Sequence, residues 1–205
     1  MKIRDAIHAS LFIFTGMQHI AIFASGKGSN ARAIIEYFKD HPSVKVALVV
    51  TNNPDAGVIK IAHQHKIISA IVSKDFFSNE DGMNKLLNAL SINMIVLAGF
   101  LQLVPNYLLK KFPNRIVNIH PALLPKHGGK GMFGNKVHEA VLKGKDSETG
   151  ITIHYVNEKY DEGEIIFQKK IAVEAHDTVE SLAGKIQIVE HDWYPKTIEK
   201  LLTAA

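Results

Sequence analysis

The 205-residue sequence contains no cysteine. Disulfide bridges, thiolate metal sites and cysteine nucleophiles are therefore excluded, and the composition fits the cytoplasm, where we expect the protein to reside. No apolar run approaches the roughly 20 residues that a membrane-spanning helix needs, so we expect no membrane partner. Long runs of like charge, low-complexity tracts and internal repeats are also missing, which argues against intrinsic disorder.

Basic residues exceed acidic ones only slightly, giving a formal net charge of +4. They are scattered along the chain, apart from short pairs such as Lys110-Lys111 and Lys169-Lys170. Nucleic-acid-binding proteins usually gather basic residues on one face or interleave them with aromatic side chains. We therefore expect no nucleic-acid partner, while the excess fits anionic small-molecule substrates and a merely basic surface equally well. Nothing in the sequence indicates an oligomeric state.

The remaining composition, 46% hydrophobic and 21% charged, is that of a chain with a full core, and its length suits one domain. The first sixteen residues differ from the rest. Lys2 and Arg4 precede a mostly apolar stretch, residues 7–14, which loosely imitates a signal peptide, but polar residues interrupt it and no small-residue cleavage site follows. We interpret residues 1–16 as an N-terminal extension, from a start codon assigned too early, and residues 17–205 as a single domain.

Hydrophobic periodicity predicts alternating strands and helices over that domain. The expected strands are residues 19–25, 44–51, 67–72, 92–98, 115–119, 151–156 and 164–173. The expected helices are residues 30–39, 55–65 (with Asp55 as N-cap), 79–90, a short segment after Pro105, 136–142 and 179–202. This order predicts an open, doubly wound, mostly parallel α/β sheet, with an antiparallel pair of strands and a long helix at the C-terminal end. Ligands of such sheets bind beyond the carboxyl ends of the strands.

A glycine-rich loop, Ser25-Gly26-Lys27-Gly28-Ser29-Asn30, joins the first expected strand to the first helix. Its glycines allow a tight turn, and the free N–H groups of the helix start suit an anion such as a phosphate. The loop also matches a relaxed dinucleotide fingerprint. However, the second strand ends Thr51-Asn52-Asn53, without the acidic residue that would hold a ribose. We therefore favour a phosphate monoester over a dinucleotide as the ligand. The alternative that the glycines form a turn needed only for helix packing remains open.

Three polar residues suggest a reaction centre. Asn118 and His120 are two residues apart at a strand end, so their side chains point the same way, and Asp161 lies in an acidic turn between two later strands. An amide can donate to a developing oxyanion, an imidazole can move a proton near neutral pH, and a carboxylate can orient that imidazole. Such a trio suits transfer of an acyl or formyl group to an amine. The plainer interpretations are a core histidine and a solvated acidic hairpin.

The other histidines carry less information. His63 and His65 are two apart on a helix and face different directions, whereas His154 can approach the reaction centre from its strand. No converging set of ligands has the spacing of a zinc site, so we expect no metal.

From about His19 to Leu202 the chain resembles the glycinamide ribonucleotide formyltransferases, folate-dependent enzymes of purine synthesis with a Rossmann-like fold. The motifs that carry the resemblance are SGKGSN, LAGFLQLV at 97–104, NIHPALLPK, TGITIHYVNEKYDEG and EHDWYP at 190–195. The Asn-x-His-Pro run and the distant aspartate are shared with other formyltetrahydrofolate enzymes. Among these enzymes, the Gly-x-Gly-Ser-Asn loop favours the glycinamide ribonucleotide formyltransferases.

The resemblance implies a role for each site residue, with 10-formyltetrahydrofolate as co-substrate and no metal. The implied catalytic residues are Asn118, His120 and Asp161. The implied ribonucleotide-binding residues are Gly28, Ser29 and Asn30 at the phosphate and Gln187 and Glu190 at the ribose or glycinamide. The implied folate-binding residues are Leu101, Gln102, Leu103, Val104 and Asn118, with the 156–161 loop closing over the pterin ring.

The implied mechanism is direct formyl transfer. Asn118 and a protonated His120 would stabilise the oxyanion, and a proton would pass from the amine to the folate through His120 or through a water held by Asp161. We expect Asp161 to raise the pKa of His120 above its usual value of about 6.5.

Two positions depart from the resemblance, because Gln102 and Asn79 stand where relatives often have arginine, which affects the expected contacts to the folate tail. The loop 127–135, HGGKGMFGN, is longer than in many relatives, and its glycines suggest a mobile cover. Three alternatives remain. A formyltetrahydrofolate deformylase usually has an extra N-terminal domain, and a methionyl-tRNA formyltransferase usually has a C-terminal tRNA-binding domain. A non-catalytic nucleotide-binding module would bind its ligand without regard to His120 and Asp161.

Overall fold

The computed structural model describes residues 16–203 of the chain. The expected extension at residues 1–16 lies outside the described residues except for Gly16, so that division of the chain stays a prediction. In the described part, no helix is both long and apolar enough to cross a membrane.

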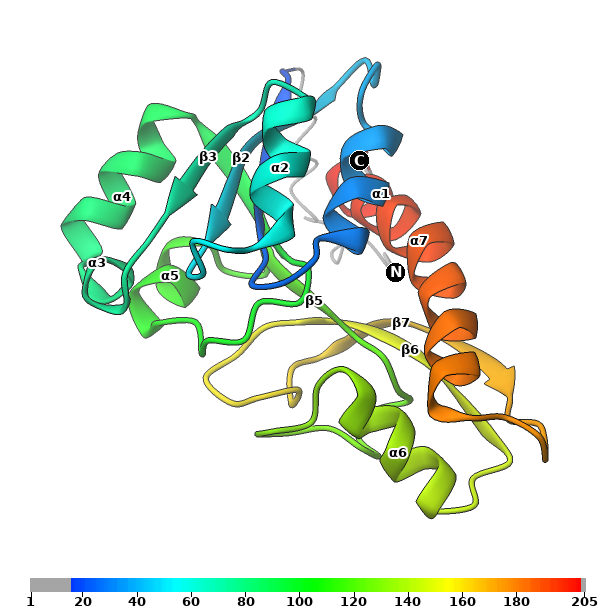
Figure 1. Cartoon of the computed structure of the whole chain (residues 1–205). Helices are drawn as coiled ribbons and strands as arrows, with labels where there is room; N and C mark the ends of the chain where they lie inside the picture. The colour runs from blue at the N-terminus through cyan, green and yellow to red at the C-terminus, as the bar shows by residue number, and fades with distance from the viewer. Residues whose placement is uncertain (1–15, 204–205) are drawn as a thin grey trace, which may run out of the picture.

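A seven-stranded sheet forms the centre of the molecule, in the order β3-β2-β1-β4-β5-β6-β7 (Figure 1). Its strands are β1 Gln18–Phe23, β2 Val44–Thr51, β3 Ile68–Ile71, β4 Ile92–Leu97, β5 Ile116–His120, β6 Glu148–Tyr155 and β7 Ile165–Ala172. The first five strands pair in parallel, and β6 and β7 join them antiparallel. The mostly parallel sheet with an antiparallel C-terminal pair confirms the predicted fold class.

Helices cover both faces of the parallel part. The helices of the described residues are α1 Ser29–Tyr37, α2 Gly57–Gln64, α3 Lys74–Ser78, α4 Glu80–Ala89, α5 Asn106–Lys111, α6 Asn135–Lys143 and α7 Val179–Thr203. Buried residues of α1, α2 and α7 belong to one hydrophobic core, and those of α3, α4 and α5 belong to the other. Figure 1 shows α7 running beside α1, and α6 lying with the antiparallel strands.

Alternation along the central strands explains the two cores. In β1, Ile20 and Ile22 face the core under α1, while Ala21 and Phe23 face the core under α4. All four side chains are fully buried. A parallel strand covered on both faces has no polar side, which is why its sequence is a continuous apolar run.

The last helix is fixed to the sheet by a fully buried tyrosine. The hydroxyl of Tyr194 donates to the main-chain oxygen of Leu97 at 2.8 Å and lies 3.2 Å from that of Val117. These carbonyls belong to the neighbouring strands β4 and β5. The EHDWYP motif therefore places α7 over the ends of the strands that carry the site.

One local prediction was wrong, and one short helix was missed. Asp55 does not cap α2, which begins two residues later with Ala56 as its N-cap. The side chain of Asn53 accepts from the Asp55 N–H and prolongs the turn. The five-residue helix α3 was not predicted, because it is too short to show a period; Ser73 caps it by accepting from the N–H of Phe76.

Candidate functional site

The polar residues of interest line a cavity of about 920 Å³ beyond the carboxyl ends of β1, β4 and β5. Here the strand order reverses direction, since β1 is followed in space by β2 on one side and by β4 on the other. Such a switch point opens a crevice between the flanking loops. Ser25 joins those loops: its hydroxyl donates to Asn52 at 2.6 Å and accepts from the Leu101 N–H at 3.1 Å.

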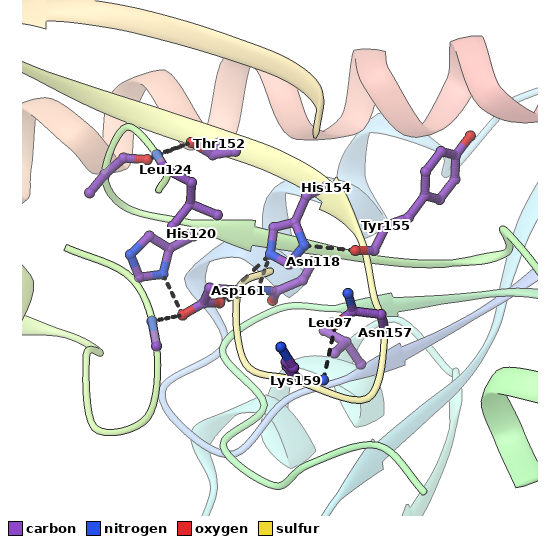
Figure 2. Close-up of polar contacts among 12 residues, drawn as sticks. Leu97, Asn118, His120, Leu124, Thr152, His154, Tyr155, Asn157, Lys159 and Asp161 are labelled. Atoms are coloured by element: carbon purple, nitrogen blue, oxygen red, sulfur yellow. Dashed lines mark hydrogen bonds and ion pairs between the residues drawn. The ribbon is translucent and has the colours of Figure 1, made fainter. Parts of the chain in front are cut away.

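Asn118, His120 and Asp161 converge in this cavity, as the sequence predicts. Asn118 and His120 come from β5, and Asp161 comes from the loop after β6. The Asp161 carboxylate lies between them: Oδ2 is 3.4 Å from His120 Nδ1, and Oδ1 is 3.4 Å from the Asn118 amide nitrogen. Figure 2 shows Asp161 between the rings of His120 and His154.

The backbone around Asp161 is unusual and built for its position. Asp161 itself has φ +59°, a left-handed conformation that few residues other than glycine adopt. Such strain persists where the surroundings enforce it, commonly at functional sites. Two residues on, a Cβ on Gly163 would lie 1.6 Å from the carbonyl oxygen of Tyr155. The loop therefore requires glycine there to return so closely to the end of β6.

His154 is the fourth member of the cluster, and it reaches Asn118 because β5 and β6 pair them directly. Its Nδ1 lies 2.8 Å from the carbonyl of Tyr155, which only accepts, so Nδ1 carries the hydrogen. Its Nε2 is then free to accept from the Asn118 amide at 3.1 Å. One N–H of Asn118 is held in this way. The other faces Asp161 at a distance that is long for a hydrogen bond.

The pKa of His120 is lowered, which corrects the expectation that Asp161 raises it. The side chain is 3% exposed, and burial of the ring is the largest effect. The negative charge of Asp161 and the hydrogen bond to the His127 carbonyl act in the opposite direction but are smaller. His120 is therefore neutral near neutral pH, and a protonated His120 is not the resting form of the site.

The tautomer of neutral His120 follows from its contacts. Its Nε2 lies 2.8 Å from the main-chain oxygen of His127, so Nε2 carries the hydrogen. Its Nδ1 then presents a lone pair toward Asp161, where an arriving proton would be shared with the carboxylate. The pKa of Asp161 is lowered, although its burial alone would raise it, because hydrogen bonds, including the one from the Gly129 N–H, favour the charged form.

Sequence reasoning missed two contributors to this site. The Gly129 N–H donates to Asp161 at 2.9 Å, and His127 supplies a carbonyl to His120. Main-chain groups leave no side-chain signature. His138 on α6 also lines the cavity; it is 4% exposed, and its Nδ1 has no partner among the residues described.

The residues expected to hold a ribonucleotide lie at one side of the cavity, though not all of them line it. Asn30, Gln187 and Glu190 do, whereas Gly28 and Ser29 do not. Helix α1 begins after Gly28 without a side-chain cap, so its first N–H groups are free for an anion. Gly28 has φ +81°, and a Cβ there would lie 2.9 Å from Val58. Its structural role is the turn itself.

The residues expected to bind the folate all line the cavity. These are Leu101, Gln102, Leu103 and Val104, in the loop after β4. Leu101 and Leu103 are about half exposed. Gln102 has a buried Oε1 with no partner in the described part of the chain. Asn79 is not in the cavity, because its side chain caps α4 by accepting from the Gly82 N–H.

No group of three or more potential metal ligands occurs among residues 16–203. The contacts among Asn118, His120, His154 and Asp161 bring together an amide, two imidazoles and one carboxylate. These groups are suited to hydrogen bonding and proton transfer.

A model of the formyl transferase family, described as "Formyl transferase", matches residues 18–198. The chain belongs to the formyl transferase family. The match spans β1 to most of α7, so it includes every strand of the sheet and all residues of the cavity discussed above.

Two relatives and one solved structure that are similar to this formyl transferase carry the name phosphoribosylglycinamide formyltransferase. The chain is 41% identical to a chloroplastic phosphoribosylglycinamide formyltransferase of Arabidopsis thaliana, over 87% of its length and 63% of that protein. It is 37% identical to the enzyme of that name from Bacillus subtilis, over 91% of its length and 95% of that protein. A crystal structure of phosphoribosylglycinamide formyltransferase from Bacillus halodurans matches with 39% identity and a TM-score of 0.81, covering 91% of this chain and 96% of that one.

Glu190 of this formyl transferase gives a testable pH dependence. Its pKa is raised to about 7, chiefly by burial, although the hydrogen bond from Asn30 at 2.9 Å opposes the shift. The unfolded chain loses this proton near pH 4.5, but the folded chain keeps it until about pH 7. Stability therefore falls as pH rises through this window. In Glu190→Gln we expect the midpoint of urea unfolding to show no such fall between pH 4.5 and pH 7.

The matched control is Glu180→Gln, an exposed glutamate at the start of the same helix. It should keep the wild-type pH dependence. Equal slopes for all three proteins between pH 4.5 and 7 would contradict the assigned protonation of Glu190.

Proposed function

We propose that this chain transfers the formyl group of 10-formyltetrahydrofolate to the amine of 5-phosphoribosylglycinamide. The products are formylglycinamide ribonucleotide and tetrahydrofolate, in de novo purine biosynthesis. The observation that carries the proposal is the convergence of Asn118, His120 and Asp161 in one cavity that is lined by both polar and apolar residues. The names of its relatives agree with it.

The two sides of the cavity suit the two substrates. The glycine-rich loop and the start of α1 offer N–H groups to a phosphate, and Asn30, Gln187 and Glu190 offer polar groups to the ribose and glycinamide. The apolar wall 101–104 suits a flat pterin ring, with main-chain groups to read its edge. The cavity volume is in the range of small-molecule sites.

The first chemical step is attack of the amine on the formyl carbon. A carbon–nitrogen bond forms, and the formyl oxygen becomes an oxyanion. The Asn118 N–H that faces Asp161 over 3.4 Å is the donor available to this oxygen, because His154 holds the other one. A fixed donor of this kind stabilises the transition state without having to reorganise.

The second step moves one proton and releases the folate. His120 Nδ1, the unprotonated nitrogen of the neutral ring, accepts the proton of the attacking amine. The adjacent Asp161 carboxylate stabilises the imidazolium that results. The proton then passes to N10 of the folate as the carbon–N10 bond breaks, either directly or through a water. The same histidine acts first as base and then as acid, and the holding of both substrates lowers the rest of the barrier.

Release of tetrahydrofolate tests this function directly. The protein is mixed with 10-formyltetrahydrofolate, with and without 5-phosphoribosylglycinamide. We expect release that depends on the ribonucleotide. Equal release without it, with formate accumulating, would assign a deformylase instead. An absence of reaction in both mixtures, from protein that is folded, would contradict the proposed substrates.

A further inference from the structure

Asp146 lies in the turn between α6 and β6, outside the cavity, and binds two consecutive residues of the segment that follows β5. Its Oδ1 pairs with Lys126, and its Oδ2 lies 2.6 Å from His127 Nε2. The Asp146 side chain is 9% exposed and that of His127 15%, whereas that of Lys126 is 65% exposed. Lys126 and His127 hold the pKa of Asp146 below its usual range. None of these groups takes part in the mechanism above.

The main chain of the same segment holds two catalytic residues. The carbonyl of His127 accepts from His120 Nε2 at 2.8 Å, and the N–H of Gly129 donates to Asp161 at 2.9 Å. Residues 127–129 therefore set where the imidazole and the carboxylate lie relative to each other. His127 has φ +58°, a conformation that is unfavourable without support from its surroundings. Its side chain is anchored at Asp146.

We propose that Asp146 is a positioning residue: its hydrogen bond with the His127 side chain holds segment 127–129 and thereby fixes the Nε2-protonated tautomer and the orientation of His120. The expected effect on kcat rests on the proposed function, whereas the expected effect on the tautomer of His120 does not. When the anchor is lost, the carbonyl of His127 moves away, and the ring of His120 can turn or carry its hydrogen on Nδ1. A ring in that form cannot accept a proton on the nitrogen that faces Asp161.

The test compares Asp146→Ala with Asp146→Asn. The alanine removes the anchor, while the asparagine keeps an oxygen that accepts from His127 Nε2. We expect Asp146→Ala to lower kcat by about 10- to 100-fold with KM within about twofold, since small misplacements of a catalytic group are costly. Asp146→Asn should recover most of the rate. Lys126→Met is the matched control: it removes the exposed partner of Asp146, a type of ion pair that contributes little, and should leave kcat unchanged.

A second background shows whether the effect passes through His120. In His120→Ala, addition of Asp146→Ala should change the residual rate by less than about twofold, because the positioned group is already gone. An equal fall in both backgrounds, or a kcat in Asp146→Ala within twofold of wild type, would overturn the proposal.

Two-bond ¹H–¹⁵N spectra of the imidazoles give a readout that needs no substrate. The His120 signals, assigned by their loss in His120→Ala, should show the Nε2-protonated form in the wild type and a mixture in Asp146→Ala. If Asp146→Ala does not fold, His127→Asn carries the same test, since asparagine tolerates the left-handed backbone and the carbonyl remains. An unchanged tautomer in the variant would overturn the proposal even if the enzyme uses another amine.

Discussion

Asn118→Ala should lower kcat by about 10²–10³-fold, which is the usual effect of losing one oxyanion donor. One N–H of the Asn118 amide donates to His154, and the other points toward Asp161, whose Oδ1 lies 3.4 Å from the amide nitrogen. Only this second N–H can meet the formyl oxygen as charge develops. The donor acts in the transition state rather than on the bound substrate. We therefore expect KM to change little while kcat falls, in steady-state assays of tetrahydrofolate release.

The control for this variant is Asn88→Ala, which removes an exposed amide on α4, outside the cavity, whose oxygen accepts from Lys111. It should leave kcat at the wild-type value. A kcat for Asn118→Ala within about threefold of wild type, in a protein with the same thermal midpoint, would contradict the role of Asn118 as the oxyanion donor.

His120→Ala should lower kcat by about 10²–10⁴-fold, the range for loss of a general acid–base group. The buried ring presents Nδ1 to Asp161 and is held at Nε2 by the His127 carbonyl, so it has one nitrogen available for the proton of the amine. His63→Ala on the exposed face of α2 serves as control. Turnover near the wild-type level in His120→Ala would remove His120 from the mechanism.

The pH dependence of kcat tests whether the neutral form of His120 is the active one. Because burial lowers the pKa of His120 below 6.5, the neutral, proton-accepting ring persists at pH values where an exposed histidine would already be charged. We expect kcat to stay level down to pH 6.5 and to fall only at lower pH, and this fall should be absent from the residual activity of His120→Ala. A profile that already falls between pH 7.5 and 6.5 in both the wild type and Glu190→Gln would contradict the lowered pKa of His120, since Glu190, whose pKa is about 7, titrates in the same range.

The sheet could be predicted because its strands carry their pattern locally. The strands from β1 to β5 are short apolar runs between helices with a clear period, and β2 has the boundaries that its sequence predicts. The exceptions are features that depend on a few side chains. The Asn53 side chain accepts from the Asp55 N–H, and α2 begins at Gly57 rather than at Asp55. Helix α3 is too short for its period to be recognised.

The site could be predicted only in part, since its parts lie in different elements. Asn118 and His120 share a strand, and their spacing alone places them on one face. Asp161 was one acidic residue among several in its turn, and spacing did not distinguish it from a solvated carboxylate. What distinguishes it in the structure is its left-handed backbone and the close return of the loop at Gly163.

The charge state of His120 was beyond sequence reasoning for a physical reason. The sequence places a carboxylate near the imidazole, which by itself predicts a raised pKa. It does not give the depth of burial, and the 3% exposure of His120 decides the outcome in the other direction. The His127 carbonyl and the Gly129 N–H are main-chain groups, and only the path of the folded loop brings them to His120 and Asp161.

The central claim is that the formyl group passes directly from the folate to an amine at this site. The most direct test uses 10-formyltetrahydrofolate labelled with ¹³C in the formyl carbon, with 5-phosphoribosylglycinamide in H₂¹⁸O, and mass spectrometry of the products. The account predicts formylglycinamide ribonucleotide that contains ¹³C and no ¹⁸O. Formate that contains both labels, with no labelled ribonucleotide, would mean that water attacks the formyl carbon and would contradict the account.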